Sequence, residues 1–374
     1  MQRGGGDAGL RVAVLVEQVL APVPGGTGRY AFEVANALVA EAPPGAAVAT
    51  WTAWHGDLAP ARAPVASGPR RLPVPARVLA RAWEHGLGPA PREADVVHAP
   101  TPLFPPRRGR PLVVTVHDAV PWTHPDTLSA RGVRWHRRMI ERAARVADAI
   151  VVPTAAVAGE LARHVALRTA PVVVAEGVSA ALVPPPDAAA RAERLELPDG
   201  DYLVTLATLE PRKGLDVLLR ALALPAAPVV PLLVVGQPGW GGVDVTGSAQ
   251  HLGIGSRVRV LGRLPDADLA VVLGRAAALV APSRAEGFGL PVLEAMAAGV
   301  PVVSSDAAAL VEVGGGATVT VPVGDSVALA GALADVLGSA PERARLAAAG
   351  RRRAADFSWA AAARRLWELY GSLV

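Results

Sequence analysis

The sequence from residue 278 to residue 296 reads ALVAPSRAEGFGLPVLEAM. It opens with four apolar residues, as in a buried parallel strand, and it closes on an apolar segment that is expected to be helical from Pro291. The glycines between the two allow a tight turn. A strand, a glycine-rich turn and a helix in succession predict one unit of an α/β sheet, with a ligand bound beyond the carboxyl end of the strand.

The turn in this segment carries both anion-binding and hydroxyl-binding groups. The backbone N–H groups of Phe288, Gly289 and Leu290 are expected to converge at the positive end of the helix dipole, which makes an anion site. Glu286 in the loop and Glu294 on the helix suit paired sugar hydroxyls, one carboxylate for a hexose and the other for a ribose. The alternative is that Glu286 is a solvated loop charge and Glu294 a charge that complements the helix dipole.

The same alternation of strands and helices extends through the whole chain. Strands are expected near residues 10–16, 94–98, 112–117, 149–152 and 172–174, with helices at 29–42, 129–147 and 156–165. After the proline-rich stretch at 183–187 the alternation restarts, with strands at 202–208, 229–235, 258–261, 278–281 and 302–304. Helices are expected between them, at 215–224, 266–277 and 291–298, and three Ala-rich helical segments end the chain.

This pattern predicts an α/β protein with two doubly wound Rossmann-like domains that face each other across a cleft. We expect a first domain over residues 1–180, a second over 181–357, and a final helix over 358–374. The ligand site is expected between the domains, at the carboxyl ends of the strands of both.

A cationic turn follows the first strand of the second half. The segment 208–214 reads TLEPRKG, and Lys213 is the one lysine among the 37 basic residues. Arg212 as a fork and Lys213 as a point charge can neutralise a diphosphate, and such cations ease the departure of a nucleoside diphosphate. The alternative is a pair of ordinary surface cations.

Two further loops in the first half are candidates. Gly25 and Gly26 begin a glycine-rich turn before a helix, which allows close approach of the backbone to a phosphate. His117 ends a strand and is expected to bond a sugar hydroxyl or to handle a proton. For the histidine, the alternative is a structural hydrogen bond.

Composition excludes several classes of protein. The chain has 374 residues, of which 51% are hydrophobic and 19% charged, so global disorder is excluded. It contains no cysteine, which excludes disulfides and thiolate metal sites. The sequence shows neither a P-loop, a zinc-protease motif nor a dinucleotide fingerprint. Neither a long apolar run nor a signal-peptide core is found, and a cytoplasmic protein that binds no nucleic acid is expected.

The predicted helix at 129–147 carries a stripe of basic side chains. At 100° per residue its arginines share one side, while apolar residues occupy the other: Arg131, Arg134, Arg138, Arg142 and Arg145. The stripe is either a solvated face over a core contact or a surface that docks on anionic lipid or on a polyprenyl-diphosphate-linked acceptor. Docking on lipid would make the protein peripheral at the inner membrane face.

Taken together, these motifs resemble one known family. EGFGLPVLE at 286–294, EPRKG at 210–214 and GGTGRY at 25–30 are similar to the retaining GT-B glycosyltransferases of family four, in the branch of bacterial mannosyl- and rhamnosyl-transferases of polysaccharide assembly. The resemblance extends to His117-Asp118, to 235–240, to 261–264 and to 357–359. It spans nearly the whole chain.

The resemblance implies an enzyme that transfers a hexosyl group, most typically mannose from GDP-mannose, to a hydroxyl of a glycan, lipid-linked or small-molecule acceptor. It implies that the second domain binds the donor, the first binds the acceptor, and the last helix crosses back onto the first domain. Arg212 and Lys213 would bind the diphosphate with help from the Gly25-Gly26 backbone. Phe288, Gly289 and Leu290 would offer N–H groups. Glu286 would hold the transferred sugar, Glu294 the ribose, and His117 the sugar near its reacting carbon, while Gly262, Arg263 and Leu264 would lie by the base.

The resemblance also implies that neither metal nor cofactor is needed. The chain departs from the family pattern at two places. Ala207 stands where some members have a further arginine, and Glu176-Gly177-Val178-Ser179 lacks the usual Asn and Asp around Gly-Val, with no clear consequence for catalysis. A nucleotide-sugar 2-epimerase and a non-catalytic binding module remain as alternatives, and a dehydrogenase is disfavoured.

Overall fold

A computed structural model describes residues 9–62 and 66–374, and its contacts divide the chain into two compact units. The first unit takes in the described residues up to 119, with 131–177 and 358–374. The second takes in residues 120–130 and 178–357. The boundaries predicted after residues 180 and 357 stay predictions, and the sequence did not indicate that residues 120–130 pack with the second unit. The amino-terminal residues behind the signal-peptide argument, 1–8, lie outside the described residues.

The first unit is built on a seven-stranded sheet in which every pair of neighbours is parallel. The strand order is β3-β2-β1-β4-β5-β6-β7, so the chain starts in the middle and winds outward in both directions. The strands are β1 (Arg11–Leu15), β2 (Ala47–Trp54), β3 (Ser67–Pro75), β4 (Val96–Ala99), β5 (Leu112–Thr115), β6 (Ala149–Val152) and β7 (Val172–Val173).

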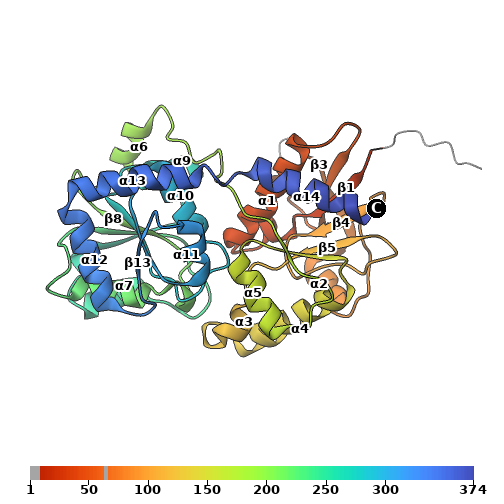
Figure 1. Cartoon of the computed structure of the whole chain (residues 1–374), viewed down its shortest axis with the longest axis horizontal. Helices are drawn as coiled ribbons and strands as arrows, with labels where there is room; N and C mark the ends of the chain where they lie inside the picture. The colour runs from red at the N-terminus through yellow and green to blue at the C-terminus, as the bar shows by residue number, and fades with distance from the viewer. Residues whose placement is uncertain (1–8, 63–65) are drawn as a thin grey trace, which may run out of the picture. The chain divides into compact units, whose positions relative to one another are not determined.

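Successive residues of these strands serve opposite faces of the sheet, and both faces are covered. Ala13, Val97 and Val114 belong to a core shared with α2 (Ala76–Glu84) and α4 (Ala130–Val146). His98 and Thr115 contact instead α14 (Trp359–Leu373) and α1 (Gly25–Ala40). The last helix lies along α1 in Figure 1, and α5 (Ala155–His164) packs on β6 and β7. Two 3₁₀ turns complete the unit, η1 (Glu17–Leu20) and η2 (Ala59–Ala61).

The second unit repeats this plan with six parallel strands in the order β10-β9-β8-β11-β12-β13. They are β8 (Leu203–Leu206), β9 (Leu232–Val235), β10 (Val258–Gly262), β11 (Ala278–Ala281), β12 (Val302–Ser305) and β13 (Val319–Val321). The central strands are buried almost throughout, which explains their uninterrupted apolar sequences.

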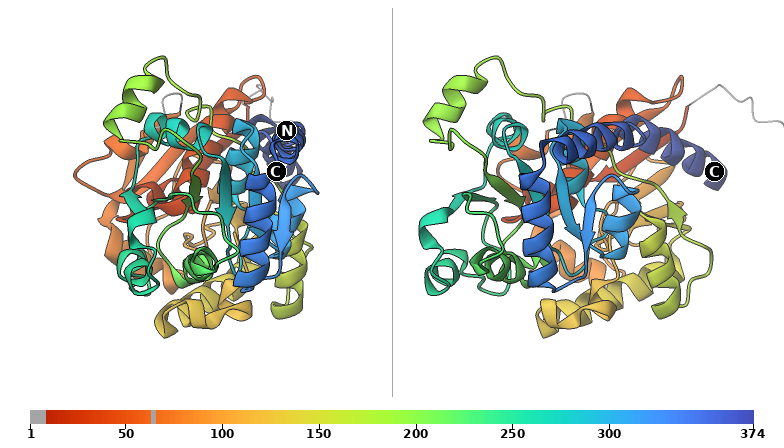
Figure 2. Two further views of the ribbon diagram at one scale, coloured as in Figure 1. Left: turned by 90° about the vertical axis from the view of Figure 1, so that its left-hand side faces the viewer. Right: turned by 60° about the vertical axis from the view of Figure 1, so that its left-hand side comes forward.

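Helices cover both faces of the second sheet (Figures 1 and 2). One layer is α7 (Leu215–Ala223), α8 (Val245–His251) and α12 (Ser326–Gly338), and the other is α9 (Asp266–Gly274), α10 (Leu290–Ala298), α11 (Ala308–Gly314) and α13 (Ala340–Ala354). Helix α6 (Ala188–Arg194) packs against α9. The short elements are α3 (Val120–Thr123), η3 (Pro125–Thr127), η4 (Pro211–Lys213) and η5 (Gly255–Arg257).

The structure corrects the sequence reading in detail. The glycines at 25 and 26 form the first turn of α1, and not a loop before a helix that starts at residue 29. Strands β2, β3 and β13 were not predicted, and β3 contains two prolines besides its last residue, Pro75, which is acceptable because it is an edge strand. Among the residues that the structure describes, no helix has the length and apolar character needed to cross a membrane.

Candidate functional site

The cationic turn that the sequence singled out lies directly after β8 as the 3₁₀ turn η4. It ends at Gly214, which adopts a left-handed conformation with φ 65°. A Cβ atom at this position would lie 2.1 Å from the carbonyl oxygen of Pro282, so only glycine fits. The backbone N–H of Arg284 also donates to the carbonyl of Arg212, at 2.8 Å. The turn is therefore fixed against the loop that follows β11.

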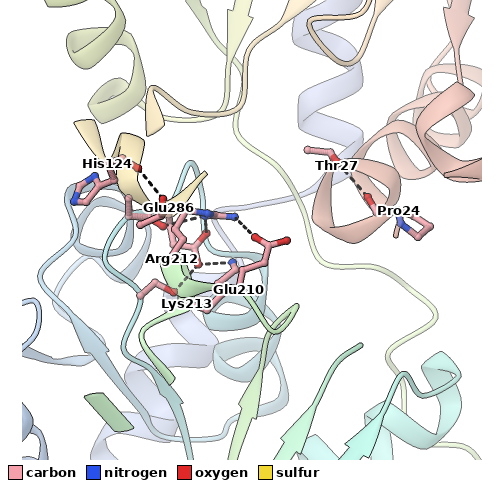
Figure 3. A network of polar contacts seen from close by, with 10 residues as sticks. Pro24, Thr27, His124, Glu210, Arg212, Lys213 and Glu286 are labelled. Carbon is pink, nitrogen blue, oxygen red and sulfur yellow. Dashed lines mark hydrogen bonds and ion pairs between the residues drawn. The ribbon is translucent and has the colours of Figure 1, made fainter. Parts of the chain in front are cut away.

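Glu286 lies at the centre of the site and binds both cations. Its carboxylate accepts from Nη1 of Arg212 at 2.9 Å and from Nζ of Lys213 at 2.6 Å (Figure 3). Ser283 Oγ donates to the same carboxylate at 2.7 Å. The side chains of Lys213 and Glu286 are 13% and 10% exposed, so this is a sheltered ion-pair network and not a pair of solvated surface charges.

The electrostatics of this cluster favour the ionised carboxylate. Burial alone would raise the pKa of Glu286, but the positive charges of Lys213 and Arg212 outweigh it and bring the pKa to about 2. Burial lowers the pKa of the Lys213 ammonium, against the attraction of Glu286. In the neutral pH range Glu286 is therefore an anion that supplies the counter-charge for the turn.

A second ion pair, between Arg284 and Asp216, holds the turn that carries Arg212 and Lys213. Arg284 makes a two-pronged contact with Asp216 at the start of α7, with both N···O distances 2.8 Å. Arg284 Nη1 also donates to the carbonyl of Pro211. The guanidinium thus joins η4, α7 and the loop after β11, which fixes the direction in which Arg212 and Lys213 point.

The amino end of α10 adjoins this cluster along the chain. Gly289 caps the helix with φ 102°, and a Cβ there would lie 2.5 Å from a methyl group of Leu310. Phe288 is buried and packs edge-on against Phe357, with ring centroids 5.7 Å apart. The first N–H groups of a helix have no acceptor within the helix, so this end of α10 is suited to an anion. Glu294, on the same helix, is 6% exposed.

The remaining predicted residues are distributed over both units. Gly262 is the last residue of β10, and Arg263 and Leu264 follow it. The carbonyl of Gly262 accepts from the N–H of Gly236 at 2.9 Å. Gly25 and Gly26 form the first turn of α1 in the first unit. His117, also in the first unit, follows β5, and its Nε2 donates to the carbonyl of Pro100 at 2.8 Å. The structural hydrogen bond considered as its alternative is thus present.

Sequence reasoning missed several charged neighbours. His124, from the segment 120–130, is half-buried, and its pKa is lowered by burial and by the charges of Arg284 and Arg212. Glu210 lies 3.9 Å from Arg212, and Glu176 lies 3.6 Å from His117. Position in the sequence indicated none of these contacts apart from Glu210, which stands within the EPRKG motif. Among the described residues, no group of three or more His, Asp and Glu side chains is arranged to hold a metal ion.

The arrangement has a definite chemical capacity. Two sheltered cations share one carboxylate at the carboxyl end of β8 and β11, beside a helix amino end. An anionic group that binds the cations would leave Glu286 free to accept hydrogen bonds from the hydroxyls of the same ligand. A ligand with a diphosphate next to a polyhydroxyl ring meets both requirements.

Models of two protein families match the chain in succession. The model described as glycosyltransferase family 4 matches residues 24–181, and the model described as glycosyl transferases group 1 matches residues 191–353. Together they leave out little beyond the first residues, the stretch between them and the end of the chain.

Curated relatives resemble parts of the chain. A D-inositol 3-phosphate glycosyltransferase of Salinispora tropica is 36% identical over 291 residues, which are 72% of this chain and 60% of the relative. An O-antigen chain mannosyltransferase B of Escherichia coli is 30% identical over 209 residues, 54% of each chain. The chain thus spans about half the length of the curated relatives that it matches.

Solved structures show the same fold over nearly all of the chain. The Anabaena protein HepE in complex with UDP and glucose superimposes with a TM-score of 0.76, at 20% identity, covering 97% of this chain and 100% of the other. At that identity the likeness shows the fold alone. The fold is GT-B, with two parallel α/β sheets, as the sequence predicted.

Proposed function

The chain belongs to family 4 of the glycosyltransferases, and from that premise we propose that it moves a hexosyl group, with retention of configuration, from a nucleoside-diphosphate sugar to an acceptor hydroxyl. Mannose from GDP-mannose is the donor that we favour, and a glycan, a lipid-linked saccharide or a small molecule is the acceptor. The mannosyltransferase names of two relatives support the choice of mannose, and the inositol-phosphate name of a third supports a small-molecule acceptor.

The observation that carries the proposal is the Arg212–Glu286–Lys213 network. In the proposed complex the diphosphate replaces Glu286 as the partner of Arg212 and Lys213, and Glu286 turns to the hydroxyls of the hexose. As the bond to the sugar breaks, negative charge grows on the departing diphosphate, and the two cations stabilise it. They hold that charge in a sheltered site where its attraction is strong.

Other residues complete the proposed donor site. Phe288, Gly289 and Leu290 offer N–H groups at the α10 amino end, Glu294 holds the ribose, and Gly262, Arg263 and Leu264 lie by the base. From the first unit, Gly25 and Gly26 assist the diphosphate, and His117 contacts the sugar.

A direct test is a thermal-shift screen with GDP-, UDP-, dTDP- and ADP-sugars, followed by a transfer assay with the donor that binds. A ligand that binds only the folded state raises the melting temperature, and we expect one sugar nucleotide to do so by several degrees. Lys213→Met should abolish that rise, while the exposed Arg275→Gln should keep it. No stabilisation by any sugar nucleotide would contradict the proposal, and isomerisation of the donor without acceptor would indicate a 2-epimerase instead.

We also propose that the transfer needs no divalent metal ion, because Arg212 and Lys213 already meet the charge of the diphosphate. Turnover should persist when EDTA is added to the assay. A loss that Mg²⁺ or Mn²⁺ restores would contradict this part of the proposal.

The basic stripe on α4 supports a peripheral contact with an anionic membrane. Arg131, Arg134, Arg138 and Arg145 are exposed, as that contact requires. Arg142 is an exception to the predicted stripe, because it stacks on Phe104 and donates to the carbonyl of Trp83 at 2.8 Å. Val78 on α2 and Leu87 just after it are 57% and 64% exposed, and such apolar side chains can enter the lipid interface.

Vesicle sedimentation tests this contact. The triple variant Arg131→Gln, Arg134→Gln and Arg138→Gln should bind anionic vesicles several-fold more weakly and use a lipid-linked acceptor less well. A control triple in the exposed arginines 275, 352 and 365 should bind like the wild type. Equal sedimentation of both triples would reject the membrane contact.

A further inference from the structure

His117 is held between two hydrogen-bond acceptors inside the first unit. Its Nε2 donates to the carbonyl of Pro100 at 2.8 Å, and its Nδ1 lies 3.6 Å from Oε1 of Glu176. A carbonyl and a carboxylate both require a proton on the nitrogen that faces them. The surroundings therefore suit the imidazolium form, which carries both protons. The side chains of His117 and Glu176 are 12% and 6% exposed, so the pair is sheltered from water.

The ring of His117 is fixed from a third side by Tyr30 of α1. The two rings meet edge to face, with centroids 4.7 Å apart and an interplanar angle of 84°. The hydroxyl of Tyr30 is itself bonded to Thr115 Oγ1 at 3.2 Å. Because Tyr30 and Thr115 are fully buried, the imidazole has little room to rotate away from Glu176.

Glu176 is held in place by its neighbour along the chain. A Cβ atom on Gly177 would lie 2.3 Å from the backbone nitrogen of Trp359, so the backbone here runs in close contact with the start of α14. The backbone that carries Glu176 is therefore held against the first residues of α14.

We propose, building on the function proposed above, that Glu176 is a positioning residue that keeps His117 doubly protonated and correctly oriented. His117 then acts in the transfer as a cationic hydrogen-bond donor, and not as a base. A sugar hydroxyl that replaces the Pro100 carbonyl would accept a hydrogen bond from Nε2.

The other titratable groups around His117 either raise its pKa or are uncharged. Burial opposes the charge on His117, but Glu176, the Pro100 carbonyl and the carboxylate of Asp118 outweigh it, and the pKa of His117 is raised. His98 on β4 is neutral, because burial and the charge of His117 lower its pKa to about 3. Tyr30 on α1 is also neutral, since burial raises the pKa of its hydroxyl. Without Glu176, burial would have the larger effect, and the pKa of His117 would fall.

The test is an NMR titration of His117 in the full-length protein without ligand, with the signal assigned through His117→Asn. We expect the His117 pKa to fall in Glu176→Gln and in Glu176→Asn, because both replace the carboxylate with a neutral amide. Glu176→Asp should recover part of the shift, and the exposed Glu141→Gln on α4 should leave the titration unchanged. An unaltered His117 titration in the folded Glu176→Gln or Glu176→Asn protein would overturn the proposal.

Steady-state kinetics of the same variants provide a second, independent measurement. In Glu176→Gln we expect kcat to fall at least tenfold above the lowered pKa of His117 and to recover toward acid pH, with the donor KM changed less than threefold. A kcat loss with no change of the pH profile would overturn the positioning role. Because the titration needs no substrate, it tests Glu176 even if no transfer is found. Transfer together with an unaltered titration would overturn the Glu176 inference alone.

Discussion

At the scale of single residues, the sequence indicated which side chains matter but not their partners. Arg212, Lys213 and Glu286 were each identified from local motifs, and the structure brings the three together across more than 70 residues of chain. That Glu286 forms ion pairs with both cations could not be inferred from spacing. Glu176 shows the same limit, because its contact with His117 depends on how β5 and the segment after β7 pack.

The low pKa of Glu286 predicts how stability depends on pH. Its pKa is about 2 when folded and 4.5 ordinarily, so its contribution is complete above pH 4.5 and is lost as the pH falls toward 2. Between pH 7 and pH 3 we expect Glu286→Gln to lose about 2 kcal/mol less unfolding free energy than the wild type. Urea denaturation at the two pH values measures this difference.

Glu193→Gln is the matched control, because Glu193 is an exposed carboxylate of the same unit. It should show the same acid dependence as the wild type. If Glu286→Gln also follows the wild-type curve, Glu286 does not form the ion pairs in solution.

At the scale of elements, the strands were predicted best where helices cover both faces. Strand β11 has the predicted bounds, because a doubly covered strand is apolar along its whole length. Strand β3 was missed since it lies at an edge, is largely exposed and contains prolines. The start of α1 was placed four residues late because its first turn contains three glycines, which are poor helix formers.

Gly214 determines the conformation of the turn between β8 and α7, which carries Arg212 and Lys213. A Cβ there meets the Pro282 carbonyl and the residue has φ 65°, so Gly214→Ala should destabilise the protein by about 1–3 kcal/mol and reduce transfer at least tenfold. Gly331→Ala in α12 is the control, since no atom lies within 4 Å of its added Cβ. Its stability should equal or exceed that of the wild type. Thermal denaturation and a transfer assay measure the stability and the activity of both variants. Equal stability and activity of Gly214→Ala and Gly331→Ala would show that the turn is not constrained.

A buried series of hydrogen bonds joins the last helix to the sheet of the first unit. Tyr370 of α14 bonds His98 Nδ1 at 2.6 Å, and His98 Nε2 bonds Thr115 at 2.8 Å. Tyr370→Phe leaves His98 without this partner, and we expect a loss of about 1–3 kcal/mol in unfolding free energy. Ser372→Ala removes an exposed hydroxyl from the same helix and should be nearly neutral. A Tyr370→Phe protein as stable as Ser372→Ala would show that the bond does not contribute.

At the scale of the whole molecule, the two α/β units were foreseen because the strand–helix alternation restarts after the prolines at 183–187. The sequence did not indicate that residues 120–130 pack with the second unit, because that segment has no strand–helix signature of its own. It places His124 beside the cations of the second unit, where the histidine pKa is lowered. Whether a segment packs with a distant part of the chain depends on tertiary contacts, and local sequence patterns do not encode these contacts.

The central claim is that Arg212 and Lys213 receive the diphosphate of the donor. Isothermal titration with the nucleoside diphosphate selected by the thermal-shift screen tests it most directly, on the wild type, on Lys213→Met and on the control Arg275→Gln. The account predicts a Kd at least tenfold higher for Lys213→Met, with the control unchanged. Equal affinity of Lys213→Met and wild type for the diphosphate would contradict it.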